Sequence, residues 1–209
     1  MTKVFIAQAN EGSQYHKMFE EAGWEVVQSV SEADLIQFIG GADVNPALYH
    51  HKVHPTTSFN TLVDTVDAQF FELGKRHNIP MAGICRGGQF LNVSNGGTMV
   101  QHCDNHGVHA GHYAIDKNSG ATIRVSSTHH QMMIPSEDAE VIAIANEATT
   151  KQVYIKTIKD LQEYMVDDIE VVYYEKTNCL CFQPHPEFNG FPQCRQYYFT
   201  LLEKYLGVG

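Results

Sequence analysis

The sequence predicts an α/β fold in which helices flank a mostly parallel central sheet. The first observation is the order of elements, because short apolar strands alternate with amphipathic helices over residues 4–95. The second is size, since the chain has 209 residues, 43% of them hydrophobic, which is enough for a sizeable core. The third is a change after Gly96-Gly97, where the sequence becomes richer in strand-type segments. We therefore expect an additional β-rich segment in the carboxyl-terminal half.

Hydrophobic periodicity defines the elements of the first half. The expected strands are the short apolar runs at residues 4–7, 24–27, 34–39 and 79–84. The expected helices carry Tyr15, Met18, Phe19 and Ala22, then Leu62, Val66, Phe70 and Leu73, and then residues 87–95. Residues 41–60 are rich in turn formers and predict a long loop.

The second half is read as strands followed by a final helix. The expected strands are residues 121–125, 141–145, 153–156, 169–174 and 180–183. The last segment places Tyr198, Leu201, Leu202 and Tyr205 on one helical face. Because we find no internal repeat, low-complexity tract or linker, we expect a single domain over residues 1–209.

Composition excludes several classes of partner. The 14 basic and 24 acidic side chains give a net charge of −10 without a basic stripe, so we expect no nucleic-acid binding. No run approaches the roughly 20 apolar residues of a membrane span, and the first residues do not read as a signal peptide. The five scattered cysteines indicate free thiols in a reducing cytoplasm. A homo-oligomer stays an open possibility.

Residues 83–92, GICRGGQFLN, place Cys85 between an expected strand and an expected helix. Gly83 and Gly87 lack the Cβ atoms that would clash in a sharp turn, so the stretch has the pattern of a nucleophile elbow. The amino terminus of the helix favours a thiolate, and the side chain of Arg86 would add to that field. The alternative is a buried core thiol, because free cysteine is among the most buried residue types. On this stretch alone both interpretations stay open.

Residues 181–188, CFQPHPEF, offer a base for such a nucleophile. His185 follows an apolar strand, and if that strand lies beside the one before Cys85, both side chains reach the same sheet edge. Glu187 then orients the imidazole, as the acid of a catalytic triad does. The alternative is an ordinary loop histidine flanked by prolines.

A pair of glycines follows another expected strand. Gly40 and Gly41 let backbone N–H groups approach a reacting carbonyl, so Gly41 and the N–H of Arg86 are candidates for an oxyanion hole. Taken alone, such a pair is most often a plain turn.

Together these stretches resemble the class I glutamine amidotransferase family. The segment from Gly83 to Gln89, with His185-Pro186-Glu187 a further 100 residues along the chain, carries the resemblance. It is most similar to the peptidase C26 branch, which includes γ-glutamyl-γ-aminobutyrate hydrolase. Three further stretches suggest that branch: GGADVNPALYH (40–50), GGTMVQH (96–102) and SSTHHQ (126–131). The resemblance spans residues 40–188 and implies a flavodoxin-like sheet.

The resemblance implies a role for each matching residue. Cys85 is expected to be the nucleophile, His185 the general base and Glu187 its orienting acid, with Gly41 and Arg86 supplying the N–H groups of the oxyanion hole. The implied reaction is cleavage of the γ-amide of glutamine or of a γ-glutamyl amide through a γ-glutamyl thioester. It requires no metal or organic cofactor.

The resemblance also implies substrate contacts. Gln89, His130 and Gln131 are expected to hold the substrate, with His129 beside them. The alternatives are an ordinary helix residue for Gln89 and a polar loop for the histidines. The chain departs from the family at Pro184 and at Ser126-Ser127, which leaves the identity of the small-molecule substrate open. Because no synthetase segment is recognised, an ammonia-using reaction would need a separate synthetase as partner.

Two rival interpretations belong to other classes of protein. The segment QHCDNHGVHAGH (101–112) is dense in metal-ligating residues. These are His102, Cys103, Asp104, His106, His109 and His112. Gly107 and Gly111 argue against a helix there, so we expect a loop over the active site and assign no metal ligands. The second rival is a non-catalytic relative that keeps the fold and binds a ligand.

Overall fold

The computed structural model describes residues 1–146, 153–154, 161–162 and 167–209. Its helices are α1 (Gln14–Glu21), α2 (Thr61–His77), α3 (Arg86–Ser94) and α4 (Pro192–Leu201), the last continued by a π-helical turn, Leu202–Leu206. Its strands are β1 (Lys3–Ile6), β2 (Glu25–Val27), β3 (Leu35–Phe38), β4 (Met81–Ile84), β5 (Thr98–Val100), β6 (His102–Cys103), β7 (Gly107–Asp116), β8 (Thr122–Thr128), β9 (Met132–Ile134), β10 (Glu140–Ala145), β11 (Val153–Tyr154), β12 (Leu161–Gln162), β13 (Ile169–Tyr174) and β14 (Cys179–Phe182).

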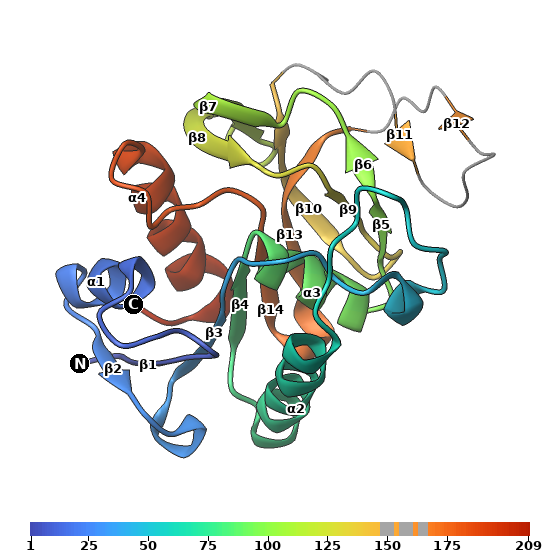
Figure 1. The fold of residues 1–209 in the computed structure, drawn as a ribbon. Helices are drawn as coiled ribbons and strands as arrows, with labels where there is room; N and C mark the ends of the chain where they lie inside the picture. Colours follow the sequence, from blue (N-terminus) through green and yellow to red (C-terminus); the bar gives the residue numbers. More distant parts are fainter. Residues whose placement is uncertain (147–152, 155–160, 163–166) are drawn as a thin grey trace.

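A nine-stranded sheet forms the centre of the molecule, in the order β2-β1-β3-β4-β14-β13-β10-β7-β8. The pairs from β2 through to β14 are parallel, and every pair from β14 onward to β8 is antiparallel. The parallel core therefore contains the predicted β-α-β units. In the β-rich second half, β7, β8, β10 and β13 extend the same sheet, while β6, β11 and β12 form one small sheet and β5 and β9 form another. The predicted fold class, a large sheet flanked by helices, is confirmed (Figure 1).

Helices cover both faces of the parallel half (Figure 1). One apolar cluster joins the sheet to α1 and α4 through Phe19, Tyr198 and Leu201. The other joins the sheet to α2 and α3 through Phe71 and Phe90. Burial of these side chains supplies the main driving force for the layered arrangement.

Local signals explain where the helices begin and end. Asn60 caps α2, because its side chain accepts a hydrogen bond from the N–H of Leu62, and Asn78 ends it in the left-handed conformation. Ser13 caps α1 in the same way as Asn60 caps α2, and Pro192 occupies the first turn of α4.

Two expectations about individual elements need correction, and a third is tested only in part. The His-rich segment, expected as a loop, instead contains β6 and the first part of β7. Backbone pairing of β7 with β8 outweighs the turn-forming composition of the segment. The loop 41–60 contains a 3₁₀ helix, Pro46–Tyr49. The expected strand 153–156 is observed as β11, and residues 155 and 156 lie outside the described residues.

The buried face of α2 differs from the apolar face expected from its sequence. Leu62 is 70% exposed, whereas Asp64, Asp67, Phe71 and Gly74 are buried. Two carboxylates thus lie where hydrophobic periodicity would place apolar side chains, and their partner belongs to the site described next.

Candidate active site

Three parallel strands bring the predicted site residues to one sheet edge. β4 pairs with β14 in a register that places Ile84 beside Phe182, so Cys85 and His185 both follow strand ends at that edge. β3 pairs with β4 on its other side, and Gly40 and Gly41 follow β3. Residues 100 positions apart in the sequence therefore meet because their strands are neighbours.

The turn at Cys85 is sharp and closely packed. Cys85 has φ of 51° and ψ of −114°, a conformation that a residue with a side chain rarely adopts. A Cβ on Gly83 would lie 2.4 Å from the backbone of Gly87, and one on Gly87 would lie 2.6 Å from the backbone of Phe38. The glycines thus allow the helix start to pack against two strands, as an elbow that holds up a nucleophile requires.

His185 is held by several contacts. Its Nδ1 lies 2.6 Å from Oε1 of Glu187, which is 3% exposed, and its ring stacks on Phe188 with centroids 4.6 Å apart. Its backbone N–H donates to Oγ of Ser126 at 2.6 Å. Ser126, which departs from the family pattern, therefore helps to fix the loop that carries the imidazole.

The electrostatics couple His185 to Cys85. Burial by itself lowers the pKa of His185, but the charge and hydrogen bond of Cys85 and the Glu187 carboxylate raise it to about 10. The imidazole is therefore held protonated beside the sulfur. Gln183 also donates to Sγ of Cys85, with the nitrogen 3.6 Å from the sulfur.

Gly40 lies between these two side chains. A Cβ at this position would be 2.9 Å from Cε1 of His185 and 3.6 Å from Cβ of Cys85, so only glycine fits without displacement. The N–H of Gly40 donates to the hydroxyl of Tyr15 at 3.1 Å. Burial and then the charge of Glu187 raise the pKa of Tyr15, which keeps this hydroxyl protonated.

The side chain of Arg86 does not have the role expected for it. Its guanidinium is 3% exposed and forms ion pairs with Asp64 and Asp67 of α2. Two carboxylates therefore compensate its charge, so it does not supply the uncompensated positive field predicted near Cys85. Its backbone N–H lies in the first turn of α3, where N–H groups have no intrahelical acceptor.

A cavity of about 240 Å³ opens in front of Cys85. It is lined by Gly41, Ala42, Asp43, Thr56, Ser58, Cys85, Arg86, Gln89, Thr128, His129, His130 and Gln131. All four residues predicted to contact substrate belong to this lining. The structure thus groups them with Cys85, Arg86 and Gly41 around one space of a size that suits a small molecule.

The polar atoms of this lining differ in what they already bind. Gln89 donates to the carbonyl of Gln131 and to Oε1 of Gln183, at 3.2 and 3.1 Å. Nε2 of His130 lies 3.2 Å from Oδ1 of Asp43, and this contact raises the pKa of His130. Oε1 of Gln131 is buried without a hydrogen-bond partner among the described residues, so it can accept one from a ligand.

His129 is held as a neutral imidazole. Burial and the neighbouring His106 lower the pKa of His129 well below its usual value. Its Nδ1 lies 2.9 Å from the carbonyl oxygen of Gln131, and because a carbonyl only accepts, this nitrogen carries the proton. Nε2 therefore bears a lone pair inside the protein.

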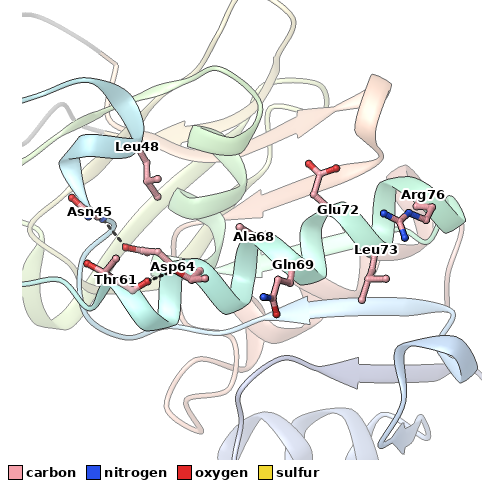
Figure 2. Close-up of a pocket in the computed structure, with 10 residues that line it drawn as sticks. Asn45, Leu48, Thr61, Asp64, Ala68, Gln69, Glu72, Leu73 and Arg76 are labelled. Atoms are coloured by element: carbon pink, nitrogen blue, oxygen red, sulfur yellow. Dashed lines mark hydrogen bonds between the residues drawn. The ribbon is translucent and has the colours of Figure 1, made fainter.

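A larger groove lies elsewhere, on the outer side of α2 (Figure 2). It measures about 670 Å³ and runs from Asn45 and Leu48 along the helix to Glu72 and Arg76. Asp64 contributes to its lining, while Cys85, His185 and Glu187 do not. The groove is thus separate from the candidate active site.

Two residues that contribute to the site, Tyr15 and Arg195, were not predicted from the sequence. Hydrophobic periodicity predicts a core-facing helix position for Tyr15, yet its hydroxyl contacts Gly40. Arg195 of α4 donates to the carbonyls of Pro186 and Glu187, at 3.0 and 3.2 Å, and so braces the loop of the imidazole. No local motif marks either residue, because each acts on a segment far away in the sequence.

Comparison with known proteins places these features in a family. The model of the peptidase C26 family matches residues 18–187. A protein of Mycobacterium tuberculosis, provisionally named as a glutamine amidotransferase, is 41% identical over 78 residues, which make up 36% of this chain and 25% of that protein. The aligned stretch thus spans only a quarter of that relative.

Solved structures share the fold over nearly the whole chain. A glutamine amidotransferase from Thermotoga maritima has a TM-score of 0.59 at 16% identity, covering 97% of this chain and 84% of its own. A chain in the structure of PurLQS from Thermotoga maritima has a TM-score of 0.61 at 16% identity, covering 96% and 99%. None of the helices in the described part of the chain has the length and apolar character needed to cross a bilayer.

Because the family model matches residues 18–187, the chain belongs to the peptidase C26 family of class I glutamine amidotransferases.

Proposed function

We propose that the protein is a cysteine hydrolase that cleaves the γ-amide of glutamine or of a small γ-glutamyl amide. The observation that carries the proposal is the series Cys85, His185 and Glu187, of which Cys85 lines the cavity. A strained turn presents the sulfur, the imidazole interacts with it, and a buried carboxylate lies 2.6 Å from the other ring nitrogen. This is the arrangement that activates a nucleophilic cysteine.

In the acylation step the Cys85 thiolate attacks the γ-carbonyl carbon of the substrate. The carbonyl oxygen becomes an oxyanion that accepts hydrogen bonds from the N–H groups of Gly41 and Arg86, which both line the cavity. Protonated His185 then donates its proton to the departing nitrogen, so that ammonia or an amine leaves and a γ-glutamyl thioester remains.

The same electrostatics support the second step. The negative charge of Cys85 is a main reason why the pKa of His185 is raised, and the thioester has no such charge. Burial then favours the neutral imidazole, which can accept a proton from an attacking water molecule. Collapse of the resulting intermediate releases glutamate and restores the thiolate–imidazolium pair.

The cavity is consistent with the amino-acid end of a γ-glutamyl substrate. Its volume of about 240 Å³ limits the ligand to a small molecule. Oε1 of Gln131 and the carboxylate of Asp43 can accept hydrogen bonds from an α-ammonium group, and His130 beside Asp43 offers a donor to a carboxylate. We propose that Gln89 and His129 shape this end of the pocket.

The test is glutamate release by the purified protein from glutamine and from a panel of γ-glutamyl amines. Cys85→Ala is expected to lower kcat/KM by about 10³-fold or more, because it removes the attacking atom. Trapping a labelled γ-glutamyl group on the wild-type protein with acid quench, and its absence from Cys85→Ala, checks the thioester directly. Turnover that survives in Cys85→Ala would refute the proposal.

A second candidate is a glutaminase subunit that delivers ammonia to a separate synthetase. Its support is the fold shared over 96% of this chain with a chain in the structure of PurLQS. The substrate panel separates the two candidates, since a subunit that awaits its partner should be nearly inactive alone on every γ-glutamyl amine. A hydrolase should show a preferred leaving group without any added protein.

A further inference from the structure

A second group of functional side chains lies on the antiparallel half of the sheet. Among the described residues, His106, His112 and Glu170 bring ligand-type atoms within 4.8 Å of one another. His106 and Glu170 are fully buried. We propose that these three residues bind a zinc ion, at a site that takes no part in the reaction at Cys85.

The carboxylate of Glu170 is the centre of this group. It is fully buried, and neither of its oxygens makes a hydrogen bond to the described residues. Nε2 of His112 lies 2.7 Å from Oε1, and Nδ1 of His106 lies 4.0 Å from the same oxygen. The 2.7 Å contact is an ion pair when His112 is protonated, and an ion bound between the two atoms would replace it.

His106 also has the outer contact typical of a metal ligand. Its Nε2 lies 3.0 Å from Oδ2 of Asp168, so that nitrogen is the one that carries the proton. Nδ1 on the Glu170 side then bears the lone pair. A carboxylate that orients the far nitrogen of a ligating imidazole is the usual arrangement around zinc.

The backbone departs from regular pairing at both strand positions. Glu170 is the extra residue of a bulge, because Val171 and Ile169 pair with the adjacent residues Ala143 and Ile144. In β7 the pairing with β8 shifts before His112, where Gly111 has φ of 68°. Bulges redirect side chains, and here the two irregular strands, β7 and β13, lie on either side of β10.

The set of atoms fits zinc better than a hard cation. Two imidazole nitrogens and one carboxylate oxygen are ligands that zinc prefers, whereas magnesium and calcium prefer oxygen alone. Zinc bonds of about 2.0–2.1 Å place ligand atoms roughly 3.3 Å apart. The present separations of 2.7 and 4.0 Å lie on either side of that value, and all three atoms lie within 4.8 Å of one another, so the two rings must rotate to meet a common ion.

Such an ion would brace the wall of the active site. The carbonyl of His106 accepts a hydrogen bond from Oγ of Ser127 at 2.6 Å. The neighbouring Ser126 accepts from the N–H of His185. The sequence pattern groups six residues of ligand type, and the folded chain brings two of them, His106 and His112, close to Glu170 of β13.

The test measures zinc in the full-length protein purified without a histidine tag. After dialysis against zinc and then against zinc-free buffer, we expect about one zinc per chain by elemental analysis. X-ray absorption at the zinc edge should show nitrogen and oxygen ligands at about 2.0–2.1 Å and no sulfur. Added zinc should also raise the melting temperature of chelator-treated protein, and added magnesium should not.

Two variants locate the ion. Glu170→Gln and His112→Gln should each lose the bound zinc and the zinc-dependent rise in melting temperature, with circular dichroism as a check on folding. Matched controls are His77→Gln, an exposed histidine at the end of α2, and Cys85→Ser, and both should keep the ion.

Three results would overturn the inference. One is wild-type protein without zinc and without a thermal response, which would leave His112 and Glu170 as an imidazolium–carboxylate pair. Another is an X-ray absorption spectrum that shows a sulfur ligand to the zinc. The third is zinc retained by both folded variants, which would place the ion elsewhere.

Discussion

Cys85 and Arg86 are consecutive residues, yet they face two regions with opposite properties. On the pocket side, formed by Cys85, His185 and Glu187, the cysteine borders a cavity and the pKa of the imidazole is raised above its ordinary value. On the helix side, formed by Arg86, Asp64 and Asp67, one guanidinium is sealed between two carboxylates. The pocket side keeps charge available for a ligand, while the helix side uses charge to hold α2 against α3.

The difference shows how one turn can serve reactivity and stability together. The positive φ of Cys85 is an unfavourable conformation that the surrounding structure must enforce. Buried ion pairs between α2 and the start of α3, together with glycine packing under the turn, supply that constraint. Substitutions on the helix side should therefore act mainly on stability, and substitutions on the pocket side mainly on reactivity.

Arg86→Met should destabilise the fold strongly. The substitution keeps the apolar stem but leaves Asp64 and Asp67 buried without a cation, so we expect the free energy of unfolding to fall by about 3–5 kcal/mol. Urea unfolding followed by circular dichroism measures it. A triple variant that also carries Asp64→Leu and Asp67→Leu removes all three charges and should recover most of the loss. A fall below about 0.5 kcal/mol for Arg86→Met would mean that the helix side does not support the turn.

Cys85→Ala should lower the pKa of His185. Folding raises this pKa from 6.5 to about 10, and Cys85 is the first of the groups that raise it. The protonated ring therefore stabilises the folded chain fully below pH 6.5, and this contribution disappears as the pH rises through about 10. NMR titration of the imidazole in both proteins measures the change. An identical titration in Cys85→Ala would show that the sulfur and the ring are not coupled.

Tyr15→Phe should reduce turnover without a comparable loss of stability. The hydroxyl accepts the N–H of Gly40, so its removal should shift the glycine turn beside Cys85 and lower kcat/KM by about 5–10-fold, or about 1 kcal/mol. Steady-state kinetics measure this effect. Tyr197→Phe is the matched control, because that hydroxyl bonds Asp116 away from the cavity and its loss should leave kcat unchanged. Equal effects from both variants would argue for a general structural role.

Leu62→Ser should have the smallest effect. Leu62 is 70% exposed, so we expect the free energy of unfolding to change by less than about 0.5 kcal/mol. Thermal or urea unfolding measures it. A large destabilisation would instead mean that the outer face of α2 is covered in solution and that the apolar periodicity of this helix marks a real contact.

Part of the candidate site could be predicted because its signals are local. The glycines around Cys85 and the proline-flanked His185-Pro186-Glu187 are patterns within a few residues of the groups they position. Strand polarity then requires their meeting, once β4 and β14 are known to be parallel neighbours. The roles assigned to these residues stay predictions until the activity measurements are made.

Local patterns in the sequence are enough to predict the fold class, the edge of the sheet that carries the site, and the turn at Cys85. Contacts between distant segments could be known only from the folded chain: Arg86 pairs with α2, Tyr15 contacts Gly40, and Glu170 lies near His106 and His112. Periodicity and motifs report on neighbours along the chain. Buried charges and hydroxyls are tolerated only where a distant segment of the chain supplies the partner. The partners of these groups are therefore known only from the arrangement of the sheet and its helices.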